Sequence, residues 1–100
     1  MIKHIVIWKL KEISTEGNRM EAATKLKDKL LSLRNKIPEI KKIEVGINTP
    51  EIQNNFDIVL EVEFANLHDL DVYQKHPAHL EVAEFVKIIR EERAAIDFVM

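Results

Sequence analysis

An alternation of apolar and mostly acidic side chains over residues 56–64 constrains the fold of this chain more than any other feature. The apolar positions are Phe56, Ile58, Leu60, Val62 and Phe64, and the positions between them are Asp57, Val59, Glu61 and Glu63. Successive side chains of a strand point to opposite faces, so one face of this strand is wholly apolar. A chain of 100 residues has room for one core, and we expect a single domain over residues 1–100.

The charge balance argues against several classes of partner. The chain has 15 Lys and Arg against 17 Asp and Glu, a formal net charge of -2, which gives no field to gather nucleic acid or an anionic membrane. Cysteine is absent, which is typical of a reducing compartment. Residues 1–10 carry Lys3, His4 and Lys9, so neither a signal peptide nor a membrane span fits. We expect a cytoplasmic protein with no nucleic-acid or membrane partner.

The remaining patterns predict the order strand, helix, strand, strand, helix, strand. Asn18 and Glu21 stand at capping-box spacing where the first helix begins. His76 and Pro77 suit the cap and first position of the last helix, after a brief helix over 67–74. We expect strands at 2–10, 43–47, 56–64 and 94–100, and long helices ending at Pro38 and near Arg93. This is the ferredoxin-like α+β pattern β-α-β-β-α-β, one antiparallel sheet with helices on one face.

This architecture leaves the second face of the sheet uncovered. The first strand is apolar on both faces, with Ile5 and Ile7 on one face and Val6, Trp8 and Leu10 on the other. We expect the second set to lie on the uncovered face, where it would form an association surface. Pairing two sheets face to face in a two-fold homodimer is the simplest way to bury it.

The segment Tyr73–His79 concentrates the scarcest titratable groups of the chain, with the one tyrosine and two of the four histidines. A neutral imidazole can take a proton at neutral pH, and a phenol can donate to a developing enolate or alkoxide. The structural alternative is that the Tyr73 hydroxyl finds a backbone partner and the His79 ring packs beneath the last helix. His76 is better explained as a helix cap than as a ligand-binding residue.

Two metal sites fit the composition less well. His4, His76 and His79 could converge on zinc, but a capping His76 points away from such a site. Glu61 and Glu63 share a strand face and could bind a hard cation, although pairing with Lys or Arg across a dimer is the simpler role. We expect no metal and no cofactor.

Three segments carry a resemblance to a known family. They are residues 2–10, the Ile37–Ile40 turn that leads into Val45-Gly46, and Tyr73–His79 with its His-Pro-Ala-His run. Together they resemble the stress-responsive A/B barrel family, also called Dabb, of the dimeric α/β barrel superfamily. The resemblance covers nearly the whole chain. It implies a homodimer whose sheets pack into a barrel, with a pocket between the sheet and the helices of each protomer.

Function varies within that family. Many members are described by their induction under stress, whereas a plant member is a cyclase that closes the ring of a linear polyketide thioester by aldol condensation. The working tyrosine and histidine of the cyclase fall on Tyr73 and His79 here, and a first-strand histidine falls on His4. Where the cyclase has a further histidine, this chain has Ile58 or Asp57, so its substrate is expected to differ.

Three functions therefore fit the sequence. The favoured one is a homodimer that binds a small apolar or aromatic molecule and has no assignable reaction. The second is a polyketide-cyclase-like or isomerase-like enzyme, in which His79 abstracts a proton, Tyr73 orients or protonates a carbonyl oxygen, and His4 assists by hydrogen bonding. The third is a purely structural role for a stable dimer.

Overall fold

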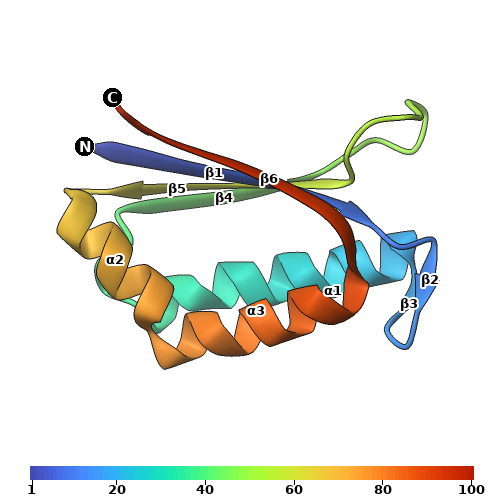
Figure 1. Ribbon diagram of the computed structural model, residues 1–100, viewed down its shortest axis with the longest axis horizontal. Helices are drawn as coiled ribbons and strands as arrows, with labels where there is room; N and C mark the ends of the chain where they lie inside the picture. The colour runs from blue at the N-terminus through green and yellow to red at the C-terminus, as the bar shows by residue number, and fades with distance from the viewer.

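The computed structural model describes residues 1–100 as one antiparallel sheet with all three α-helices against the same face (Figure 1). The sheet has the strand order β4-β5-β1-β6, and a short hairpin of β2 and β3 precedes the first helix. The strands are β1 Ile2–Leu10, β2 Ile13–Ser14, β3 Gly17–Asn18, β4 Lys42–Ile47, β5 Ile58–Phe64 and β6 Arg90–Val99. The helices are α1 Arg19–Ser32, α2 Leu67–Lys75 and α3 Pro77–Ile89, with the 3-10 turn η1 at Leu33–Asn35. The ferredoxin-like α+β fold expected from the sequence is confirmed.

The first helix begins where the capping residues predict. The Asn18 side chain accepts a hydrogen bond from the Glu21 N–H at 2.9 Å, and the Glu21 side chain accepts one from the Asn18 N–H at 3.0 Å. Gly17 adopts φ +102°, and a Cβ there would lie 2.9 Å from Glu21 Oε1, so glycine suits this turn. The helix ends at Ser32 instead of Pro38, because the chain tightens into η1 before the proline.

A sharp break separates α2 from α3. His76 is the N-cap of α3, and its Nδ1 accepts a hydrogen bond from the Ala78 N–H at 3.0 Å. Pro77 takes the first helical position, as predicted. The helix ends at Ile89, earlier than expected, because Arg90 adopts an extended conformation and pairs with Leu10 at the start of β6. The last strand therefore begins four residues earlier than the sequence pattern suggested, at Arg90 instead of Ala94.

The predicted orientation of β1 was wrong. Val6, Trp8 and Leu10 are buried beneath the helices, and Trp8 is only 5% exposed. The register explains this, because Val6 lies opposite Leu60 and Trp8 lies opposite Ile58. Cross-strand partners share a face of a sheet, and the apolar face of β5 is the one that the helices cover. The uncovered face of β1 is therefore the one that carries Ile5 and Ile7.

We call this uncovered surface the outer sheet face. Ile5 lies opposite Ile96, Ile7 opposite Ala94, and Phe98 follows on the same face of β6. Ile96 is 60% exposed and Phe98 is 41% exposed, and no helix covers them (Figure 1). β6 is an edge strand, and all ten of its residues are exposed in the protomer. None of the helices beneath the sheet has the length and hydropathy needed to cross a bilayer.

Candidate functional site

A cavity of about 210 Å³ between the sheet and the helices brings together the three residues predicted from the sequence. We call it the ring cavity, since His4 from β1, Tyr73 from α2 and His79 from α3 all line it. Its apolar walls include Val6, Leu30, Leu60, Val82 and Val86. The break at His76 lets two successive helices each supply one ring to the same space.

Tyr73 lies at the centre of this group. Its side chain is fully buried, and its ring centroid lies 4.6 Å from that of His79 and 6.0 Å from that of His4. The structural alternative gave its hydroxyl a backbone partner, but the buried hydroxyl has none. Burial raises the pKa of Tyr73 well above its ordinary value, because removing water disfavours the phenolate. The hydroxyl therefore stays protonated and available as a donor.

His79 presents an unpaired ring nitrogen. Its side chain is partly buried, and Nδ1 is buried without a hydrogen-bond partner. The pKa of His79 is lowered, first by burial; a backbone hydrogen bond with Gln74 opposes this, while His4, Arg93 and His76 lower the pKa further. The imidazole is therefore neutral at neutral pH, which is the state that accepts a proton.

His4 is held by a carboxylate that sequence analysis missed. His4 is 3% exposed on β1, and its Nδ1 bonds to Oδ1 of Asp97, which lies directly opposite on β6. A carboxylate on one ring nitrogen orients the imidazole and selects its tautomer. Only the register of β1 with β6 identifies Asp97, since the two residues stand 93 positions apart.

Trp8 adds a third unpaired polar atom. It lines the ring cavity, and its buried indole N–H has no hydrogen-bond partner. The indole N–H is a donor only, so an oxygen acceptor would satisfy it. Trp8, Tyr73 and His79 thus each contribute a buried polar atom without a partner in the protein.

The histidines do not gather as a metal site. His76 uses Nδ1 to cap α3, and no group of three or more His, Cys, Asp or Glu side chains is placed to hold a metal ion. Glu61 and Glu63 lie on the outer sheet face, where Glu63 is 4.0 Å from the Lys3 ammonium. The carboxylates of β5 therefore lie on the opposite side of the sheet from the ring cavity.

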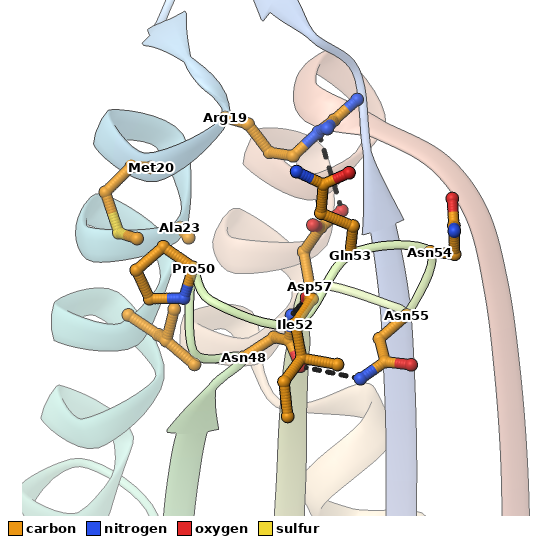
Figure 2. A pocket seen from close by; sticks show the side chains of 11 residues that line it. Arg19, Met20, Ala23, Asn48, Pro50, Ile52, Gln53, Asn54, Asn55 and Asp57 are labelled. Carbon is orange, nitrogen blue, oxygen red and sulfur yellow. Dashed lines mark hydrogen bonds and ion pairs between the residues drawn. The ribbon is translucent and has the colours of Figure 1, made fainter.

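A second cavity, of about 400 Å³, lies between the start of α1 and the loop from β4 to β5. Figure 2 shows its polar lining, in which Arg19 reaches Asp57 at 3.8 Å and Asn55 donates to Asn48 at 3.0 Å. These charged and amide groups already interact with one another. The cavity is larger than the ring cavity, but it lacks the histidines and the tyrosine and offers no unpaired acid or base.

Comparison with known proteins places the chain in a family. A sequence profile of the stress responsive A/B barrel domain matches residues 2–100. The chain belongs to the stress-responsive A/B barrel family. The resemblance of its His-Pro-Ala-His segment predicted this membership. No curated protein matches the sequence.

Solved structures agree with this assignment. A dimeric protein of unknown function with a ferredoxin-like fold from Bacteroides fragilis is 33% identical, with a TM-score of 0.88 over 99% of this chain and 95% of that one. A dimeric ferredoxin-like protein of unknown function from Thermobifida fusca is 21% identical, with a TM-score of 0.84 over 99% and 90%. A hydroxynitrile lyase from Passiflora edulis is 22% identical, with a TM-score of 0.78 over 99% and 92%. The last two likenesses concern the fold alone.

Proposed function

We propose that this A/B barrel protein binds a small, partly apolar molecule in the ring cavity. The observation that carries this proposal is the set of three buried, unpaired polar atoms around one cavity, on Trp8, Tyr73 and His79. An unsatisfied buried polar group costs about 1–3 kcal/mol. A molecule with an apolar body and one or two oxygen atoms would satisfy these groups and fill the space between them.

The protein also acts as a homodimer through the outer sheet face. The dimeric descriptions of the Bacteroides fragilis and Thermobifida fusca proteins support this. So does the exposure of Ile96 and Phe98 on a face that no helix covers. Packing this face against a second copy would remove apolar surface from water without altering the ring cavity on the other side of the sheet.

An enzymatic function is the second candidate, supported by the neutral, unpaired imidazole of His79 beside the Tyr73 ring. In this scheme His79 takes a proton from a carbon next to a carbonyl group, and the electron pair of the C–H bond forms an enolate. The Tyr73 hydroxyl donates a hydrogen bond to the enolate oxygen. His4, oriented by Asp97, hydrogen-bonds to the substrate. Return of the proton to another carbon gives an isomerase, and attack of the enolate on a second carbonyl gives a cyclase.

Acetophenone is a suitable neutral probe for binding, because it combines an aromatic ring with one carbonyl acceptor. Trp8 is the only tryptophan, so its indole N–H gives a single, unambiguous NMR signal. We expect a saturable shift of this signal on titration, and a weaker one in Tyr73→Phe. The matched control is Ile13→Ala, which should retain the shift, because Ile13 is 75% exposed and lies outside the cavity lining. A Trp8 signal that does not move at saturating probe would overturn the binding proposal.

The same probe separates an enzyme from a binding protein. In D₂O, proton abstraction by His79 would replace the methyl hydrogens of acetophenone with deuterium, which proton NMR records as loss of the methyl signal. The enzymatic function predicts exchange faster than in buffer alone, and His79→Gln would then reduce it to the buffer rate. A bound probe whose methyl signal persists at the buffer rate would support binding and count against the enzymatic alternative.

A further inference from the structure

Two arginines at the β6 end of the ring cavity make no contact with the ligand in the functions proposed above. Arg90 and Arg93 both line the cavity. Arg93 lies opposite Trp8 and Arg90 opposite Leu10 in the pairing of β6 with β1, so Arg93 shares the helix-covered face with the Trp8 indole. Both arginines are exposed to solvent, and they stand beside the apolar walls at the mouth of the cavity, the end that meets solvent.

The positive charge of these two residues is not neutralised within the protein. Neither guanidinium takes part in an ion pair, whereas the third cation of the lining, Lys87, is 2.9 Å from Glu84. Asp97, an acidic group on the same face of β6 as Arg93, is already bonded to His4. The cavity thus combines an apolar interior with two unpaired guanidinium groups at one end.

We propose that the natural ligand of the ring cavity is a compact carboxylic acid, with its carboxylate bound by Arg93 and Arg90 and its apolar body held against Val82 and Val86. This inference rests on the proposed binding function and adds the chemical class of the ligand. A guanidinium group presents paired N–H donors that match the two oxygens of a carboxylate. Unpaired positive charge at the mouth also raises the local concentration of anions.

The volume limits the size of this acid. A cavity of about 150 Å³ accommodates benzene, so the ring cavity, at about 210 Å³, takes one six-membered ring or a branched chain of similar bulk. The carboxylate then extends toward the arginines. A larger molecule would extend beyond this space.

Phenylacetate and phenylacetamide test this inference, because they have nearly the same shape and differ in charge. Isothermal titration calorimetry with the 100-residue chain is expected to show phenylacetate binding about five- to tenfold more tightly than phenylacetamide. Arg93→Gln should abolish that preference, and Arg90→Gln should reduce it. Arg34→Gln, on η1 and outside the cavity lining, is the matched control and should leave it unchanged. All three arginines are exposed, so the variants are expected to fold.

The outcomes separate this inference from the binding proposal. Equal affinities for the acid and the amide, or a preference that survives Arg93→Gln, would overturn the carboxylate assignment while the pocket itself still binds apolar probes. The carboxylate assignment would also be overturned if Arg34→Gln lost the preference for phenylacetate to the same extent as Arg93→Gln, because the net charge of the protein would then explain the preference. Failure of acetophenone, phenylacetate and phenylacetamide alike to bind would refute both the binding function and the carboxylate assignment.

Discussion

His4 on β1 and Asp97 on β6 face each other across the strand pair, with the imidazole Nδ1 bonded to the carboxylate. His4 is 3% exposed, whereas the Asp97 side chain is 38% exposed. The carboxylate holds the ring proton on Nδ1 and leaves Nε2 as the free nitrogen of the ring. An edge strand therefore sets the tautomer of a buried histidine in the ring cavity.

Removing this carboxylate should destabilise the protein modestly. Asp97→Ala leaves a buried ring nitrogen of His4 without its partner, and we expect a loss of about 1 kcal/mol in the free energy of unfolding, at the low end because Asp97 is partly exposed. Asp97→Asn keeps an acceptor oxygen and should lose less. Urea denaturation of both variants, with the exposed Glu91→Ala as control, measures the difference. If Asp97→Asn lowers the free energy of unfolding as much as Asp97→Ala does, then the charge of Asp97 stabilises the protein and the hydrogen bond does not.

The Tyr73 hydroxyl should lower the stability of the ligand-free protein, although it contributes a donor for ligand binding. Because the hydroxyl is buried without a partner, Tyr73→Phe is expected to leave the free energy of unfolding unchanged or to raise it by about 1 kcal/mol. Tyr73→Leu, which also removes the ring, should lower it. Thermal denaturation in the absence of ligand tests this. A clear destabilisation by the Phe variant would mean that the hydroxyl has a structural partner.

Stability should fall on the acid side of neutrality because of His79. Its pKa is lower in the folded protein than in the unfolded chain, so between the folded pKa and about 6.5 the unfolded chain binds more protons. The contribution of His79 is therefore complete above about pH 6.5 and declines as the pH falls through that window. His4 from β1, Arg93 from β6 and His76 at the start of α3 surround the ring and act in the same direction.

Chemical denaturation at intervals from pH 7.5 to 5 would record this decline. His79→Gln should flatten the profile, whereas His68→Gln, an exposed residue of α2 outside the cavity, should retain the slope of the unmodified protein. A profile that is equally steep in both variants would assign the pH dependence to other groups.

A charge placed on the outer sheet face should separate the dimer. Ile96 is 60% exposed in the protomer, so Ile96→Lys removes no core contact but buries an ammonium group if the faces pack together. We expect a folded monomer by sedimentation and circular dichroism. Ile13→Lys, which is 75% exposed on β2, is the matched control and should remain dimeric. A dimeric Ile96→Lys protein would place the interface elsewhere.

The order of the elements could be predicted because each one has a strong local pattern. Alternation marked β5, and capping residues marked the starts of α1 and α3 at Asn18 and His76. The ends of α1 and α3 were less predictable. Pro38 excludes a helix only at its own position, and the competition between helix and strand at Arg90 is decided by pairing with β1.

The lining of the ring cavity could be predicted only where its residues are neighbours in sequence or match a family segment. Tyr73, His79 and His4 fall into this class. Asp97 and Arg93 do not, because their positions beside His4 and Trp8 depend on the register of the first strand with the last. The face of β1 was misjudged for the same reason. Both faces of that strand are apolar, and only its pairing with β5 decides which one the helices cover.

β6 lies at the edge of the sheet, pairs only with β1 and is exposed along its whole length in the protomer. An edge strand opens more easily than a central one, so the amides of β6 should exchange with solvent earlier than those of β1 and β5. The ring cavity is therefore lined by elements that open at different rates. Tyr73 and His79 belong to α2 and α3, whereas Arg93 lines the cavity from β6, which also carries Asp97, the partner of His4. A ligand bridging the two would slow hydrogen exchange along β6 before it altered any other part of the protein.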